Sequence, residues 1–278
     1  MIRTLIGGIA VGIANIIPGV SGGTMMVILG VFNRVSECIS GVFKPKNDHR
    51  KEDIIFLIQL LIGAGIGLIG FAKVLTYLFN NYPTQTMFWF VGLVLFSIPI
   101  FIKSELKKDK INKLALVLGV ALIFIITFLN PGKSVNINPE FPSLNIFFLL
   151  SMIVVGFIGG FSMFLPGVSG SMVLLIIGQY HLFKAYLANV MSFRIDILLP
   201  LCFMGLGIVL GIVAASALIT VALKKNHAFT VSFLLGLILA SSIVLIPIDV
   251  VYTLPLIATS ALTFIFGGVV VALIDKFS

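Results

Sequence analysis

The sequence carries little charge. Only 10% of its 278 residues are Asp, Glu, Lys or Arg, whereas 59% are hydrophobic and the mean hydropathy is +1.21. A soluble domain usually carries about 25% charged residues, so this chain has too few to cover a water-facing surface. The composition excludes an ordinary soluble domain and favours a polytopic membrane protein folded as one bundle.

Residues for metal or redox chemistry are scarce as well. Cys38 and Cys202 are isolated in or beside apolar stretches, and the sequence has no CxxC motif and no Cys/His cluster. Both cysteines are interpreted as packing residues. We therefore expect no disulfide, no metal site and no cofactor.

The basic residues that do occur are unevenly distributed. The net charge of +8 could suggest nucleic acid, but Lys and Arg lie in short loops between apolar runs. If loops 41–53, 103–113 and 224–228 and both chain ends face the cytoplasm, that side holds 14 of the 18 Lys and Arg residues. Three face the other side and Lys73 lies within an apolar run. The positive-inside rule therefore predicts cytoplasmic N- and C-termini, and no nucleic-acid partner is expected.

Ten apolar runs divide the chain. They cover residues 2–17, 23–40, 54–79, 87–102, 114–129, 144–165, 171–190, 197–223, 229–246 and 254–274. A membrane-spanning helix needs about 20 residues, and several runs reach that length. The first run is shorter, which favours a hairpin that enters the membrane and returns to the same side.

An internal repeat relates two of these regions. Gly156–Ser171 lies over Gly8–Gly23 at an offset of 148 residues, with the five residues Pro-Gly-Val-Ser-Gly identical in both copies. Weaker similarities follow: Gly63-Ala-Gly65 resembles Gly205-Leu-Gly207, and Gly92-Leu resembles Gly236-Leu. The matched positions are Gly8, Gly12, Pro18, Gly19, Val20, Ser21, Gly22 and Gly30 with Gly156, Gly160, Pro166, Gly167, Val168, Ser169, Gly170 and Gly178.

The repeat and the charge distribution together predict the architecture. Residues 1–140 and 141–278 are expected to form two halves of one membrane domain, joined in the Pro-rich stretch 130–143. Each half is an all-α unit with one motif-bearing hairpin and three transmembrane helices. Because each half then crosses the membrane an odd number of times, the halves are antiparallel, an inverted-topology repeat whose site lies near the midplane. Charge does not decide whether each hairpin is re-entrant or crosses fully twice.

Each motif combines residues that interrupt a helix. Proline removes a backbone donor and disfavours helix at the preceding residue, and glycine permits left-handed or extended backbone. In the first copy the helix is expected to restart at about Ser21 to Thr24, leaving amide N–H groups without partners within the helix. Ser21 and Thr24 can cap it or donate hydroxyls, and Ser169, Gly170 and Ser171 repeat the design. Such helix starts favour an anion, and inverted symmetry would bring both together.

Other interpretations of these residues are simpler. The motifs could be ordinary turns between tightly packed helices, and Gly8, Gly12, Gly156 and Gly160 have the spacing of a helix-packing face. Broken polar backbone at membrane depth is costly without a use, so we favour the functional interpretation of the motifs. Lys73 is expected about two turns from the outer end of its helix, where it either reaches the interface or contacts a phosphate.

The motifs also match the GxSG pattern of intramembrane serine proteases, in Gly19-Val-Ser21-Gly22 and Gly167-Val-Ser169-Gly170. A nucleophilic serine needs a base within hydrogen-bond reach. No buried carboxylate is expected, and all the histidines lie in or beside loops: His49, His181 and His227. We therefore do not expect an enzyme.

The doubled motif resembles the PopT family of bacterial membrane proteins. The similar residues are Ile17-Pro-Gly-Val-Ser-Gly-Gly-Thr24, Leu165-Pro-Gly-Val-Ser-Gly170 and Gly92-Leu. The resemblance covers essentially the whole chain. It implies a flippase in the bacterial cytoplasmic membrane that returns undecaprenyl phosphate, the C55 lipid carrier of cell-wall synthesis, from the outer to the inner leaflet.

The resemblance also implies which residues contact the phosphate headgroup. The candidates are Asn15, Pro18, Gly19, Val20, Ser21, Gly22, Gly23, Thr24, Pro166, Gly167, Val168, Ser169, Gly170 and Ser171, with Lys73 matched only by its position in a helix. The second copy departs from the first at Met163, Ser171 and Met172, so the two loops need not act equally. With no ATP motif, proton coupling, sodium coupling and plain facilitation are all left open. A transporter or channel for a small soluble anion is the alternative, because paired helix starts suit such an anion equally well.

Overall fold

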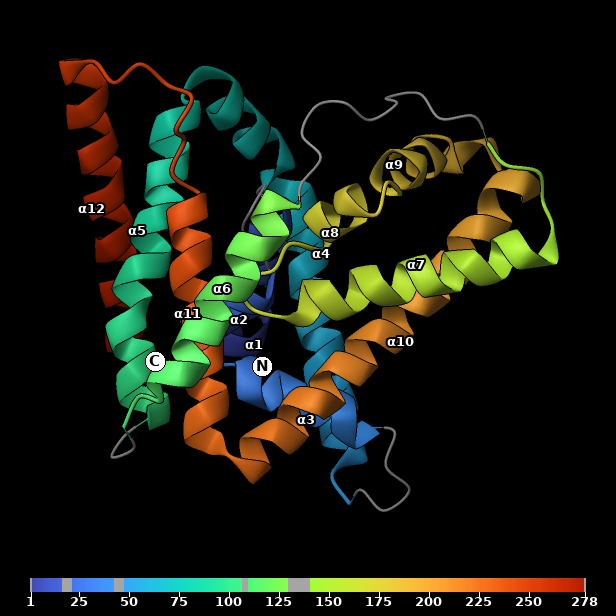
Figure 1. Cartoon of the computed structure of the whole chain (residues 1–278), viewed down its shortest axis with the longest axis horizontal. Helices are drawn as coiled ribbons and strands as arrows, with labels where there is room; N and C mark the ends of the chain where they lie inside the picture. The colour runs from blue at the N-terminus through green and yellow to red at the C-terminus, as the bar shows by residue number, and fades with distance from the viewer. Residues whose placement is uncertain (1, 17–21, 43–47, 107–109, 130–140, 278) are drawn as a thin grey trace.

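The computed structural model describes the chain except for residues 1, 17–21, 43–47, 107–109, 130–140 and 278 (Figure 1). Over the described residues the expectation of an all-α protein is confirmed. The first half holds α1 (Ile2–Ile16), α2 (Gly22–Ile28), α3 (Phe32–Val42), α4 (Arg50–Asn81), α5 (Pro83–Phe101), the π-helical η1 (Ile102–Leu106) and α6 (Lys113–Phe128). The second half holds α7 (Ile146–Phe164), α8 (Gly170–Ile176), α9 (Tyr180–Ala188), the 3₁₀ turn η2 (Val190–Ser192), α10 (Ile195–Lys225), α11 (His227–Val244) and α12 (Leu254–Phe277).

Asparagine caps the starts of three helices. The Asn112 side chain accepts a hydrogen bond from an α6 amide at 3.0 Å, Asn145 does the same for α7 at 2.8 Å, and Asn226 for α11 at 3.1 Å. Each cap satisfies a backbone donor that the first helical turn would leave without a partner. Polar capping residues therefore set where apolar runs begin as helices.

Within the part of the chain that the structure describes, six helices are long and apolar enough to cross a membrane: α4, α5, α7, α10, α11 and α12. This agrees with a multi-pass membrane protein. Five of them are among the six spanning segments that the sequence predicts; the sixth of those, α6, has 16 residues and is shorter. On α4, α10 and α12 many large apolar side chains are exposed, among them Ile69, Val209 and Leu254. A lipid environment would cover them.

The helix that precedes each motif, α1 in the first half and α7 in the second, packs in the same way. Helix α1 packs against α4, and α7 packs against α10, the pair that runs side by side in Figure 1. A Cβ atom on Gly12 would overlap the Ala64 carbonyl of α4, and one on Gly160 would overlap the Ile208 carbonyl of α10. The predicted packing role of these glycines is therefore confirmed: they let two helix backbones come into contact.

The packing also corrects one detail of the sequence comparison. Gly63 on α4 faces the backbone of α1, and Gly207 on α10 faces the backbone of α7, whereas Gly65 and Gly205 face open space. Gly63 is therefore equivalent to Gly207, not to Gly205 as the pairing of the Gly-x-Gly segments predicted. The pairing was wrong because both segments contain two glycines, and only helix contacts show which glycine packs.

The remaining long helices pair between the halves. Helix α5 packs on α12, and α11 packs on α6 (Figure 1). Again glycine permits the contact: a Cβ on Gly92 would overlap the Phe264 carbonyl of α12, and one on Gly236 would overlap the Leu116 carbonyl of α6. The central helix α11 carries the most deeply buried side chains, including Leu237. The two halves thus share one core.

A second break divides each hairpin. The sequence predicted continuous runs 23–40 and 171–190, but α2 ends before Gly30, with φ +65°, and α8 ends before Gly178, with φ +73°. In both, two amides after the helix return to its carbonyls: Gly30 N to Val27 O and Val31 N to Met26 O, and likewise Gly178 N to Leu175 O and Gln179 N to Leu174 O. This is the Schellman helix end, which favours glycine. The bend between α2 and α3 is 119°.

Candidate functional site

The start of α2, directly after the first motif, is in contact with the second motif. The Gly167 amide donates a buried hydrogen bond of 2.7 Å to the Thr24 hydroxyl oxygen, across 143 residues of sequence. Gly23 lies against the same segment, because a Cβ atom there would be 2.7 Å from the Phe164 carbonyl oxygen. A larger residue at position 23 would collide with the end of α7. The sequence predicted that the two helix starts converge, and their described parts are in direct contact.

The second motif forms a short bridge between α7 and α8. Helix α7 ends at Phe164, Gly167 takes a left-handed conformation with φ +80°, and Val168 is buried. Helix α8 then begins at Gly170, with Ser169 in the cap position. The glycine fits this bridge because other residues rarely adopt a positive φ.

Ser169 does not cap α8 with its side chain, although the sequence allowed either role. Its hydroxyl lies 2.9 Å from the Ser171 hydroxyl, in a hydrogen bond that either atom can donate. The two hydroxyls are not buried. They therefore form a pair of donors and acceptors at the start of α8, open to a bound group.

The first motif is described only in part. Pro18, Gly19, Val20 and Ser21 lie outside the described residues, whereas Asn15, Gly22, Gly23 and Thr24 are within them. The Asn15 amide nitrogen donates to the Val11 carbonyl at 3.0 Å, and a Cβ on Gly22 would lie 2.7 Å from that nitrogen. The Asn15 side chain therefore lies directly over the start of α2.

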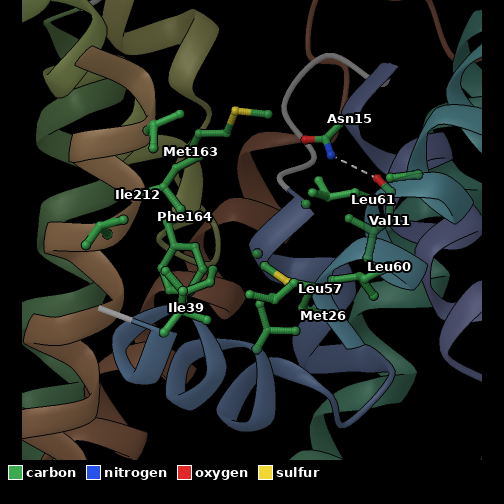
Figure 2. A pocket seen from close by; sticks show the side chains of 17 residues that line it. Val11, Asn15, Met26, Ile39, Leu57, Leu60, Leu61, Met163, Phe164 and Ile212 are labelled. Atoms are coloured by element: carbon green, nitrogen blue, oxygen red, sulfur yellow. Dashed lines mark hydrogen bonds between the residues drawn. The ribbon is translucent and has the colours of Figure 1, made fainter. Parts of the chain in front are cut away.

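A cavity of about 420 Å³ adjoins this contact between the motifs. Figure 2 shows Met163, Phe164 and Ile212 of the second half on one side of it, and Asn15, Val11 and Leu61 of the first half on the other. Helix α3 closes the lower side in this view. The described lining residues are Val11, Asn15, Gly22, Gly23, Met26, Val35, Ile39, Val42, Leu57, Leu60, Leu61, Ala64, Met163, Phe164, Val209, Ile212 and Val213.

The predicted cation is not assigned to this site. Lys73 belongs to α4, but the placement of its side chain lies outside what the structure describes. Lys184 is exposed on α9, and Arg34 on α3 forms a 3.0 Å ion pair with Asp53. The hydrogen bond described above joins the Gly167 amide to the Thr24 hydroxyl.

The burial of Asp53 was not predicted from the sequence. It is only 5% exposed, contrary to the expectation that no buried carboxylate would be present, and it also accepts a hydrogen bond from the Cys38 thiol at 3.2 Å. The pairing with Arg34 offsets the cost of burying its charge. A signal was available: Asp53 falls in the first turn of a long apolar helix, the position where a carboxylate stabilises the helix start.

A second missed feature links α3 to α10. The Ser36 hydroxyl donates to the Ser216 carbonyl at 3.1 Å, and both Ser36 and Ser40 lie 3.3 Å from the Thr220 hydroxyl. These four residues are buried. Among the described residues, α9 of the second half makes no comparable contact with α4. The two hairpins are therefore docked differently, although their sequences are related.

The arrangement of the histidines bears on the protease alternative. His49 pairs with Glu52 at 3.3 Å, and His227 lies 3.6 Å from Glu105. The third histidine lies on α9, stacked edge-on against a tyrosine. In the described structure the Ser169 hydroxyl pairs with the Ser171 hydroxyl.

Comparison with known proteins agrees with the resemblance drawn from the two motifs. Residues 11–272 match the family described as undecaprenyl phosphate translocase-like. A polyprenyl-phosphate transporter of Staphylococcus aureus is 27% identical over 246 residues, which cover 87% of this chain and 85% of that protein. A polyprenyl-phosphate transporter of Vibrio cholerae is 30% identical over 256 residues, covering 86% of this chain and 76% of that protein. No solved structure matches the chain.

The family match covers both motif copies and the described residues that line the cavity between them. The duplicated hairpins are therefore features of the matched region and not additions to it. The chain belongs to the undecaprenyl phosphate translocase-like family.

Proposed function

We propose that this protein is a flippase for undecaprenyl phosphate, which it returns from the outer to the inner leaflet of the bacterial cytoplasmic membrane for cell-wall polymer synthesis. The observation that carries the proposal is the contact between the two motifs, Thr24 with Gly167, beside a cavity between the halves. Two related transporters named for polyprenyl phosphate support the substrate class.

The phosphate would be bound by amides and hydroxyls. A phosphate headgroup cannot cross hydrocarbon unaided, whereas its prenyl tail can stay in lipid, so the protein needs to shelter only the headgroup. Ser169 and Ser171 offer hydroxyls at the start of α8, and Asn15 offers an amide beside Gly22 and Gly23. The candidates predicted from the sequence that lie outside the described residues, Pro18 to Ser21, and the Lys73 side chain remain part of this proposal.

The two halves are proposed to act as an inverted repeat, 1–140 and 141–278, with both termini in the cytoplasm. The matching helix contacts in the two halves support the repeat. The unequal docking of the hairpins suggests how it works: α3 is fixed to α10 by buried hydroxyls, while α9 has no comparable contact with α4 among the described residues. Exchange of these two arrangements would expose the site to each leaflet in turn.

The lining of the cavity favours a lipid over a small soluble anion. A binding site for a soluble anion needs water access and polar walls, but the described lining residues are apolar apart from Asn15 and the glycines. Leu61 on α4 is 69% exposed and Val209 on α10 is 53% exposed. Both line the cavity and face outward, which supports an opening toward lipid.

We propose no catalytic role, and proton coupling, sodium coupling or plain facilitation would each fit the fold. The test of headgroup contact is binding of polyprenyl phosphate to the purified protein. If Ser169 contacts the phosphate, Ser169→Ala should weaken binding by about 1–3 kcal/mol. Ser192→Ala, in the turn after α9, is the control that leaves binding unchanged. Equal binding by Ser169→Ala and the wild type would count against the proposed contact.

A further inference from the structure

Among its described lining residues, the cavity between the halves is polar at one end only. Asn15 has the one amide side chain among the described lining residues, and it lies beside Gly22. The other side chains are aliphatic, aromatic or methionine. A cavity with one polar end suits an amphiphile held with its polar group at Asn15 and its carbon chain along the apolar walls.

We propose that this cavity binds the isoprenoid units nearest the phosphate, so that the protein recognises the prenyl chain as well as the headgroup. The inference rests on the proposed function and extends it to a second binding element. Without this second binding element, a flippase could leave the whole prenyl tail in the bilayer and bind only the phosphate. With it, the first part of the chain enters the protein.

The size of the cavity sets how much of the chain it holds. At about 30 Å³ for each water-sized group, a cavity of about 420 Å³ takes roughly 14 heavy atoms. That corresponds to about two or three five-carbon isoprene units. The rest of a C55 chain must leave the protein.

The walls fit a branched and partly rigid chain. Val11 and Leu60 on one side and Phe164 and Ile212 on the other present an apolar surface with little conformational freedom. Met26 adds a flexible, polarisable side chain that adapts to methyl branches. An apolar cavity of this kind stays free of water, so a hydrocarbon gains more from it than a soluble anion does.

The exit for the rest of the chain lies between α4 and α10. Leu61 and Val209 line the cavity and are largely exposed, on helices whose outer faces are apolar. A chain that leaves the cavity past these residues enters lipid without crossing a polar surface. The cavity, its polar end and its exit thus form one continuous path for a single-chain lipid phosphate.

Chain length is the direct test. Purified wild-type protein in detergent is titrated with inorganic phosphate and with dimethylallyl, geranyl, farnesyl and geranylgeranyl phosphate, which carry one to four isoprene units. Affinity should rise by at least tenfold from one unit to three and then level off, because only the first units are buried. Affinity that is independent of chain length would overturn the inference while leaving the proposed function in place. No binding of any prenyl phosphate would overturn both.

A variant that fills the cavity provides the second test. Ala64 lines the cavity, whereas the next residue, Gly65, faces open space. Ala64→Leu should lower affinity for farnesyl phosphate by about tenfold and leave affinity for dimethylallyl phosphate unchanged. Gly65→Leu, on the same helix, should leave both unchanged. If a folded Ala64→Leu protein binds farnesyl phosphate as tightly as the wild type does, the inference is contradicted. If that variant does not fold, Val209→Phe at the exit is tested in its place, together with the length series on the wild-type protein.

Discussion

Thr24 and Gly167 belong to different halves of the chain, yet the hydroxyl of the first accepts a 2.7 Å hydrogen bond from the amide of the second. The bond is buried and joins the start of α2 to the bridge between α7 and α8. It fixes the position of one motif relative to the other. A site built from both hairpins depends on this kind of direct contact.

Replacing the Thr24 hydroxyl should weaken this connection. Thr24→Val keeps the shape of the side chain but cannot accept the bond, so we expect a loss of about 1–3 kcal/mol in stability. Transport should fall with it, because the motifs are no longer held in register. Thr24→Ser keeps the hydroxyl and should stay near wild type. Thermal unfolding in detergent measures the first effect, and unchanged unfolding of Thr24→Val would show that the bond contributes nothing.

Glycines on α4 and α10 should divide into two classes. Gly67→Ala and Gly207→Ala place a methyl group against the backbone of a neighbouring helix and should destabilise by about 1–3 kcal/mol. Gly65→Ala and Gly205→Ala meet open space and should be neutral or slightly stabilising. Fluorescence-detected size-exclusion chromatography after heating ranks all four variants. If the two glycine variants on the same helix were equally stable, the helix contacts described above would be wrong.

Holding α3 on α10 should stop the transport cycle. The Ser36 and Thr220 hydroxyls are 3.3 Å apart, so cysteines at these two positions would bring two thiols close together. In a background with Cys38→Ser and Cys202→Ser, oxidation of the double variant Ser36→Cys and Thr220→Cys should abolish transport, and a reducing agent should restore it. Ser36→Cys alone is the control. Full activity of the verified cross-linked protein would mean that α3 does not leave α10 during transport.

The proposed orientation places two of the connections between helices on opposite sides of the membrane. Figure 1 shows the turn between α10 and α11 at the end opposite the connection from α11 to α12. We expect a cysteine in place of exposed His49 to react with a membrane-impermeant maleimide only from the cytoplasm, and one in place of exposed Asp249 only from outside. Cys202→Ser removes the exposed natural thiol. Labelling of both sites from one side of intact cells would refute the proposed topology.

Much of the fold follows from repetition in the sequence. The doubled Pro-Gly-Val-Ser-Gly motif predicted that two helix starts would meet, and Thr24 and Gly167 do so. The matched pair Gly30 and Gly178 was visible too, but its meaning was not: both end a helix in a left-handed turn. A glycine within an apolar run is equally compatible with helix packing, so only backbone geometry separates the two roles.

The cavity could not be predicted from sequence. Asn15 and Met163 are equivalent positions in the two copies, and the structure places both on the wall of one cavity. The sequence shows that they correspond but not that they face each other, because that depends on how α1 and α7 dock. The same holds for Thr220, whose hydroxyl is one of many on apolar helices until α3 packs against it.

Transfer of labelled undecaprenyl phosphate between the leaflets of reconstituted liposomes is the most direct test of the central claim. The account predicts faster transfer than in protein-free liposomes, no passage of an inorganic anion, and loss of the faster transfer in Thr24→Val. Passage of the inorganic anion without lipid transfer, or lipid transfer no faster than in protein-free liposomes, would contradict it.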